Sequence, residues 1–149
     1  IIGSSDGVTF VDDYAHLPRE ISAVMSAAKT SDDSWGRVVA VFQPNRYNRM
    51  AVMSDEYAMA FVDADVVVIT DIYASGTQKI EGVTGHLVVD AVTRAQVNSQ
   101  VHWHEERTSL AQFVNRILRP GDVCISMGCG DIESLPRELL DVRSGVTRS

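Results

Sequence analysis

The chain has 149 residues, of which 45% are hydrophobic and 22% charged, and its formal net charge is −7. This size and composition suit one globular domain with a sizeable core. They argue against a nucleic-acid binder, which carries a basic stripe, and no apolar run approaches the roughly 18 residues that span a bilayer. The start has neither Met nor a signal-peptide pattern, so we expect a domain of a longer, cytoplasmic protein. The two cysteines are expected to be reduced.

Short apolar segments alternate along the chain with segments of helical periodicity. The pattern first predicts a strand at 7–14, a helix at 18–29, a turn at 31–36 and a strand at 37–43. It then predicts a helix at 50–61, a strand at 65–70, a helix at 82–95 and a strand at 99–105. The last predicted elements are a helix at 109–121, a strand at 122–128, a short helix at 135–142 and a frayed end at 142–149.

The strands at 37–43 and 65–70 are almost continuously apolar, which is typical of strands covered on both faces. The repeated β-α order therefore predicts one doubly wound α/β domain with helices on both faces of its sheet. In such sheets, ligands bind beyond the carboxyl ends of the strands. The polar residues and glycines suited to binding follow the predicted strands at those ends: Asp12, Asp13, Tyr14, His16, Gln43, Asn45, Arg46, Arg49, Asp71, Tyr73, Ser75, Gly76, Gly128, Gly130 and Asp131.

Two arginines stand directly after the second predicted strand, in the segment FQPNRYNR. Arg46 and Arg49 are three residues apart, so on a helical turn their side chains face the same side. Two guanidinium groups in that arrangement can bind a carboxylate or a phosphate through paired hydrogen bonds. The residue pattern alone leaves open the alternative that both arginines pair with acidic residues at the surface.

The segment DDYAH at 12–16 combines two carboxylates, a phenol and an imidazole. Paired acidic residues at a strand end can hold a metal or a ribose, as they hold Mg²⁺ in receiver domains, or they can form a solvated turn. No metal site is predicted, because neither Cys124 and Cys129 nor His102 and His104 are completed by further ligands. The chain also lacks G-x-x-x-x-G-K-[ST], so it does not bind a triphosphate in the P-loop manner by itself.

Three segments resemble motifs of one enzyme family. VDDYAHLPREI at 11–21 resembles D-D-Y-[AG]-H-H-P-x-E-[IV], and VVAVFQPNRYNR at 38–49 resembles V-x-F-Q-P-H-R-[YF]-[ST]-R. TDIYASGTQKIEGVTG at 70–85 resembles D-[IV]-Y-x-A-G-E-x-P-I-x-G-V-x-[GS]. The chain thus resembles the C-terminal domain of the Mur ligases, from about residue 7 to residue 140, and most of all the members that add L-alanine. The resemblance implies a Rossmann-like, mostly parallel sheet of five or six strands.

Mur ligases have three domains, and the resemblance implies that residues 1–149 form the third, amino-acid-binding one. The first domain holds the UDP-sugar, and the central domain holds ATP and Mg²⁺. The implied partners are L-alanine, UDP-N-acetylmuramate, ATP and the protein's own N-terminal and central domains. The reaction makes an acyl phosphate, which the amine of alanine then attacks. The third domain alone is expected to be inactive.

The second motif implies roles for three residues. Arg46 and Arg49 match its arginines and are expected to bind the carboxylate of alanine. Asn45 replaces the family's His, so it is a candidate substrate-binding residue that can form hydrogen bonds without carrying a proton. Thr77 likewise replaces a Glu of the third motif. These departures leave a ligase for another amino acid as an alternative.

The first motif implies roles for four more residues. Tyr14 and His16 match its Tyr and first His, near the amino acid and the phosphates, and His16 is the candidate catalytic residue. Asp12 and Asp13 are expected on the ATP side. The second His of the motif is Leu17 here. An alternative of another class is a non-catalytic α/β binding or receiver-like domain that uses the two aspartates and Mg²⁺; a P-loop encoded upstream would argue against it.

Overall fold

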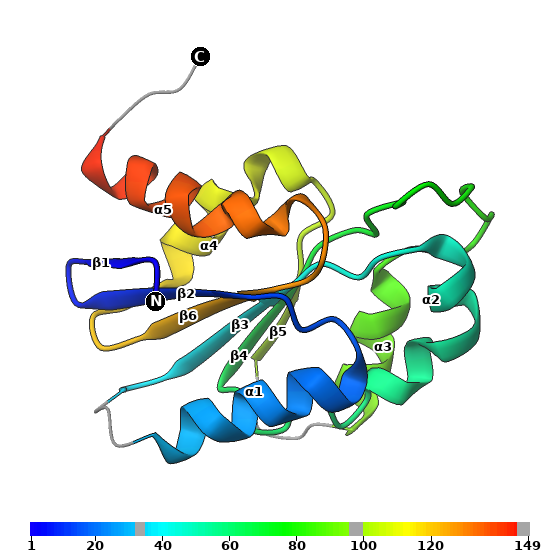
Figure 1. The fold of residues 1–149 in the computed structure, drawn as a ribbon, viewed down its shortest axis with the longest axis horizontal. Coiled ribbons are helices and arrows are strands. Elements are labelled where there is room, and N and C mark those ends of the chain that lie inside the picture. The colour runs from blue at the N-terminus through cyan, green and yellow to red at the C-terminus, as the bar shows by residue number, and fades with distance from the viewer. Residues whose placement is uncertain (32–34, 96–99, 146–149) are drawn as a thin grey trace.

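The computed structural model describes residues 1–31, 35–95 and 100–145, and shows one sheet between two layers of helices (Figure 1). The strands are β1 Gly3–Ser5, β2 Val8–Asp13, β3 Val38–Phe42, β4 Val66–Ile69, β5 Gln100–Trp103 and β6 Val123–Met127. The α-helices are α1 Pro18–Thr30, α2 Tyr47–Met53, α3 His86–Ala95, α4 Leu110–Ile117 and α5 Leu135–Ser144. The described residues also form the 3₁₀ turns η1 Ser54–Tyr57, η2 Arg107–Ser109 and η3 Asp131–Ser134.

The described strands form a single sheet in the order β1-β2-β6-β3-β4-β5. All neighbours are parallel except β1, which pairs with β2 in the antiparallel direction. The central strand β3 pairs on both sides, so Val41 lies beside Val68 of β4 and Ser126 of β6. The predicted doubly wound α/β fold, with a mostly parallel sheet of five or six strands, is confirmed.

Alternate side chains of the central strands enter two separate cores. On β3, Val38, Ala40 and Phe42 pack in the core under α1, α2 and α3, whereas Val39 and Val41 pack in the core under α4 and α5. Figure 1 shows these two groups of helices on opposite faces of the sheet. Each fully buried Val or Phe contributes about 1.5–3 kcal/mol, which explains why these strands are apolar on both faces.

Some predicted boundaries are wrong. The helix predicted at 50–61 begins earlier, at Tyr47, and passes into η1, while the helix predicted at 82–95 begins only at His86. Strand β1 was not predicted, because the short segment GSS has no apolar alternation. The strand predicted to end at residue 105 ends at Trp103. The helix predicted to end at residue 121 ends at Ile117.

Three predictions involve residues outside the described ranges. Residues 32–34 of the expected turn, residue 99 of the fourth predicted strand and residues 146–149 of the expected frayed end are not described. Fraying is wrong for residues 142–144, which continue α5.

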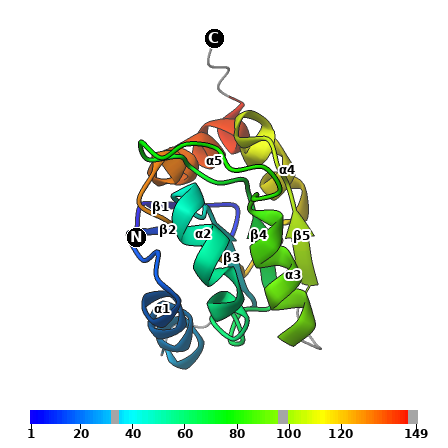
Figure 2. The same ribbon diagram turned by 90° about the vertical axis from the view of Figure 1, so that its right-hand side faces the viewer.

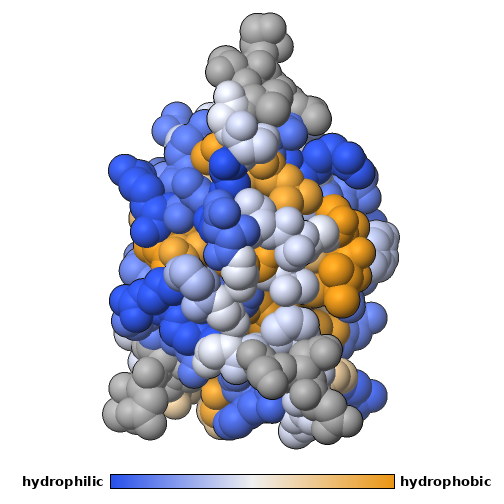
Figure 3. Space-filling view, turned by 90° about the vertical axis from the view of Figure 1, so that its left-hand side faces the viewer, coloured by the Kyte–Doolittle hydropathy of each residue, from blue (hydrophilic) through white to orange (hydrophobic). Residues whose placement is uncertain are grey.

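The two ends of the parallel strands present different surfaces. Figure 2 looks toward the carboxyl ends and shows the loop between β4 and α3 running across above α2. Figure 3 shows the opposite face, where hydrophobic areas are divided by hydrophilic residues. Ile1 and Ile2 are among the large hydrophobic residues that are exposed at the molecular surface. None of the described helices combines the length and apolarity that crossing a membrane would require.

Candidate functional site

The segment after β3 is hydrogen-bonded to the segment after β4. The N–H of Arg46 donates to the Tyr73 carbonyl at 2.9 Å, and the N–H of Tyr73 donates to the Pro44 carbonyl at 2.9 Å. Thr77 continues the contact, because its Oγ1 accepts the N–H of Tyr47 at 3.0 Å. These bonds explain why α2 begins at Tyr47 and carries Arg49 in its first turn, beside the carboxyl ends of the strands.

Arg46 has an uncommon backbone conformation, with φ of 69° and ψ of 116°. A positive φ in a residue other than glycine costs on the order of 1–3 kcal/mol and persists only where surrounding contacts impose it. Here the hydrogen bond to Tyr73 on one side and the start of α2 on the other impose it. The side chain of Arg46 is exposed at this edge.

Arg49 is oriented by a buried neighbour. Its Nη1 donates to Asn45 Oδ1 at 3.1 Å, and Asn45 is only 2% exposed. Buried Asn45 therefore contacts the guanidinium group of Arg49 from inside the fold. Arg49 also lies within electrostatic range of Glu20 and Tyr57. The pKa of Glu20 is lowered, first by hydrogen bonds from the N–H groups of Leu17 and His16, and the positive charge of Arg49 adds to this effect.

His16 is held in the same neighbourhood. Its N–H donates to Glu20 Oε1 at 3.2 Å, and its carbonyl accepts the hydroxyl of Tyr57 at 2.6 Å. The imidazole Nδ1 lies 3.2 Å from the Tyr14 carbonyl and 3.5 Å from Glu20 Oε1, and the ring meets that of Tyr14 edge-on. Tyr14 itself is 70% exposed. Glu20 and Tyr57 therefore connect His16 to the surroundings of Arg49.

Glu20 and Tyr57 were not predicted as site residues from the sequence. The Glu of the first motif was the available signal for Glu20. Tyr57 is fully buried, and the sequence offers no motif that marks it as a site residue. Burial raises its pKa, an effect that the charge of Arg49 opposes. Only the tertiary structure shows that the hydroxyl of Tyr57 donates a hydrogen bond to the carbonyl of His16.

Asp12 and Asp13 make different contacts. Asp12 Oδ1 accepts the hydroxyl of Ser126 at 2.8 Å, whereas Asp13 Oδ1 accepts the N–H of Ala15 at 2.9 Å within its own turn. Burial raises the pKa of Asp12 despite the hydrogen bond from Ser126, and the charges of Glu133 and Asp13 raise it further. Within the described ranges, no group of three or more His, Cys, Asp or Glu side chains could hold a metal ion.

Solved structures show the same fold. A murein peptide ligase from Psychrobacter arcticus superposes with a TM-score of 0.74 at 17% identity, covering 99% of this chain and 30% of that one. A domain of a putative UDP-N-acetylmuramate:L-alanyl-γ-D-glutamyl-meso-diaminopimelate ligase from Haemophilus ducreyi gives a TM-score of 0.69 at 22% identity, covering 95% of both chains. At these identities the likeness concerns the fold alone.

Curated relatives are more similar in sequence. The UDP-N-acetylmuramate–L-alanine ligase of Gloeothece citriformis is 44% identical over 140 residues, which are 93% of this chain and 28% of that protein. The enzyme of the same name from Gloeobacter violaceus is 43% identical over 139 residues, with 93% and 29% covered. The chain thus spans less than a third of the length of these relatives. The family model described as "Mur ligase, glutamate ligase domain" matches residues 1–130. A match over so much of the chain shows that it belongs to the Mur ligase family, of which it is a C-terminal domain.

Proposed function

We propose that the chain is the amino-acid-binding domain of an ATP-dependent ligase that joins L-alanine to UDP-N-acetylmuramate in cytoplasmic peptidoglycan synthesis. The names and identities of the curated relatives support this assignment. The N-terminal UDP-binding domain and the central ATP-binding domain would then belong to the same full-length protein. The structural observation that carries the proposal is the placement of Arg49. Buried Asn45 orients its guanidinium group, which lies near Glu20 and Tyr57, the two residues that bond to His16.

In this proposal, Arg49 and Arg46 bind the carboxylate of alanine. A guanidinium fork matches a planar carboxylate through two parallel hydrogen bonds. Holding the amino acid in this way places its amine near the acyl phosphate, and such orientation can supply a large part of the rate enhancement. The positive charges would also stabilise negative charge that develops in the closed cleft.

His16 is the proposed proton acceptor. The amine of alanine attacks the carbonyl carbon of the acyl phosphate, and a C–N bond forms. The bond between that carbon and the oxygen of the phosphate group breaks, and phosphate leaves. The proton that the nitrogen loses goes to the imidazole of His16, whose position is set by Tyr14, Glu20 and Tyr57. Asp12 and Asp13 are proposed to contact the ATP side of the cleft. ATP and Mg²⁺ would be held mainly by the central domain, so the 149-residue chain alone should not catalyse ligation.

The test is amino-acid-dependent phosphate release by the full-length protein, with UDP-N-acetylmuramate, ATP and Mg²⁺ present. Alanine should support a kcat/KM at least about tenfold higher than glycine or serine. A clear preference for glycine or serine would indicate a Mur ligase for another amino acid. Release that does not depend on any amino acid would contradict the ligase assignment. The gene upstream of residue 1 should encode a P-loop with G-K-[ST].

A further inference from the structure

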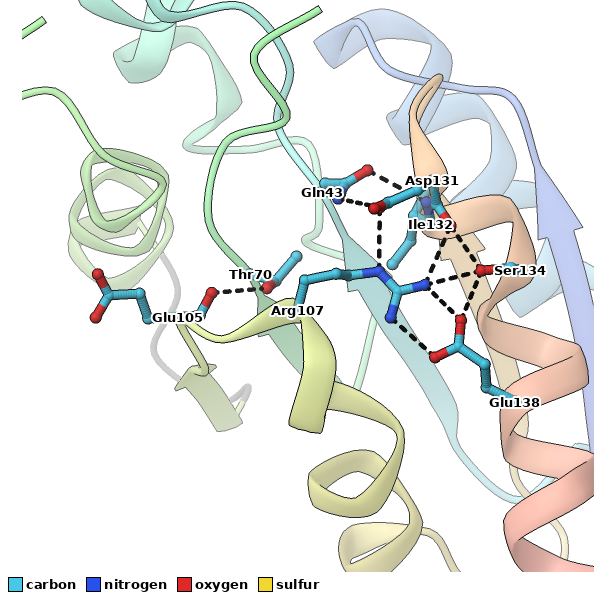
Figure 4. A network of polar contacts seen from close by, with 8 residues as sticks. All are labelled: Gln43, Thr70, Glu105, Arg107, Asp131, Ile132, Ser134 and Glu138. Atoms are coloured by element: carbon cyan, nitrogen blue, oxygen red, sulfur yellow. Dashed lines mark hydrogen bonds and ion pairs between the residues drawn. The ribbon is translucent and has the colours of Figure 1, made fainter. Parts of the chain in front are cut away.

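Arg107 makes a network of hydrogen bonds at the carboxyl end of the sheet (Figure 4). Its Nε donates to Asp131 Oδ1 at 3.1 Å, and its Nη1 and Nη2 donate to the two carboxylate oxygens of Glu138 at 3.0 and 2.7 Å. Nη2 also donates to the Asp131 carbonyl at 3.1 Å and to Ser134 Oγ at 3.0 Å. The side chain is only 19% exposed. Arg107 therefore ties η2 to η3 and to the first turn of α5.

Gln43 connects this network to the segment that carries the arginines. It directly follows β3 and is only 2% exposed. Its Nε2 donates to Asp131 Oδ1 at 2.7 Å, so that oxygen accepts from both Gln43 and Arg107. Its Oε1 accepts the N–H of Ile132 at 3.3 Å. The contacts thus run from Arg107 through Asp131 to a residue two positions before Asn45.

Gly130 brings the same loop against the other support of the arginine segment. A Cβ at this position would lie 2.5 Å from the ring of Tyr73 and 2.7 Å from Gln43 Oε1. Tyr73 is the residue whose backbone bonds to Pro44 and Arg46. The loop before η3 is therefore packed directly on Gln43, which precedes the arginine segment, and on Tyr73, which is hydrogen-bonded to it.

We propose that Gln43, Asp131 and Arg107 are positioning residues for amino-acid binding, acting through the segment 44–49 without touching the substrate. This inference rests on the proposed function, in which Arg46 and Arg49 bind the amino acid. The buried amide of Gln43 has its donor and its acceptor occupied by the loop before η3. Displacing that loop would break these bonds and shift the segment that begins α2, and a shift of about 1 Å in a binding group can cost as much as 100-fold in rate.

The first variant is Gln43→Glu in the full-length enzyme. It places a carboxylate 2.7 Å from Oδ1 of Asp131, where an amide now donates a hydrogen bond. The like charges repel, so we expect the KM for alanine to rise about tenfold while the KM for ATP stays within about twofold. Adding Asp131→Asn puts an amide donor opposite the new carboxylate and should bring the KM for alanine back to that of Asp131→Asn alone. Rescue by a second substitution distinguishes positioning from general loss of structure.

Arg37→Ala is the matched control. Arg37 is 20% exposed, and its Nε and Nη2 donate to both carboxylate oxygens of Asp122 at 2.9 and 2.8 Å. Arg37 resembles Arg107 in its own exposure and in its forked bond to a carboxylate, but it lies at the beginning of β3 and β6, away from the carboxyl ends. Arg37→Ala should lower the thermal midpoint and leave the KM for alanine unchanged. Arg107→Lys, which keeps the charge but loses the fork, should raise that KM.

Hydrogen exchange of the peptide 42–50 gives a readout that does not depend on ligation. Exchange should become about tenfold faster in Gln43→Glu, return in the double variant, and stay unchanged in Arg37→Ala at matched stability. An unchanged exchange rate in Gln43→Glu, no rescue by Asp131→Asn, or an equal rise in KM for Arg37→Ala would overturn the inference. Exchange could behave as expected while the wild-type enzyme adds no amino acid. The proposed function would then be wrong, but the inference that Gln43, Asp131 and Arg107 position the segment 44–49 would hold.

Discussion

Arg49 donates a hydrogen bond of 3.1 Å to Asn45, the residue one helical turn before it, and Asn45 is almost completely buried. A buried neutral acceptor fixes the direction of a guanidinium group without neutralising its charge. Arg49 therefore keeps its positive charge for a ligand while losing much of its conformational freedom. Such preorganisation reduces the entropy that binding would otherwise cost.

We expect Arg49→Lys in the full-length enzyme to raise the KM for alanine at least about tenfold, because an ammonium group cannot form the two parallel hydrogen bonds of a guanidinium. The KM for ATP should stay within about twofold. Steady-state phosphate release measures both values. Arg94→Lys is the control, since Arg94 lies on α3 in an exposed pair with Asp55. An unchanged KM for alanine in Arg49→Lys would refute the binding role.

Asn45→Ala should lower kcat/KM for alanine about tenfold, because Arg49 loses the acceptor that orients it. Asn45→His introduces the residue of the family motif and should retain activity with alanine. The two variants are compared by kcat/KM for alanine, glycine and serine. If Asn45→Ala has wild-type kinetics, the orientation of Arg49 does not depend on Asn45.

Glu20 makes the stability of the domain depend on pH. Hydrogen bonds from Leu17 and His16 N–H, with a smaller contribution from Arg49, lower its pKa below the ordinary 4.5. A carboxylate with a lowered pKa stabilises the folded state above its unfolded pKa, and this contribution is lost as the pH falls through the folded pKa. Because the Glu20 side chain is 48% exposed and water screens its charge, Glu20→Gln should reduce the free energy of unfolding by only a few tenths of a kcal/mol at neutral pH.

Urea unfolding of the 149-residue chain at neutral pH and at about pH 3 measures this dependence. The difference between Glu20→Gln and the wild type should shrink at the lower pH. Glu81→Gln changes an exposed carboxylate of the loop after β4 and serves as the control. A difference of equal size at both pH values would contradict the assigned role of the charge.

Gly85→Ala should destabilise the domain by about 2 kcal/mol or more, because a Cβ at Gly85 would lie 2.5 Å from the carbonyl oxygen of Thr70 and 3.0 Å from the ring of Trp103. Gly76→Ala is the comparison. Gly76 has a φ of +84° but nothing within 4 Å of the added Cβ, so only the backbone penalty of about 1–2 kcal/mol applies. Urea midpoints rank the two variants, and an equal or larger loss for Gly76→Ala would contradict the packing argument.

Most of the fold was predictable because its signals are local. Continuous apolar strands such as 38–42 indicate a covered parallel sheet, and the helical spacing of Ile21 and Met25, both buried, marks the inner face of α1. The start of α2 was not predictable from periodicity, because the bond between Tyr47 and Thr77 joins residues 30 positions apart.

The sequence by itself determined the layered α/β architecture, the side of the sheet that gathers the candidate residues and the family resemblance, because hydrophobic periodicity and short motifs act over neighbouring positions. Only the tertiary structure decided that Asn45 orients Arg49, that Tyr57 supports His16 and that Arg107 reaches Gln43 through Asp131. The last two relationships join residues that are dozens of positions apart. Their geometry follows from how the strands and helices pack, which no local pattern of residues encodes.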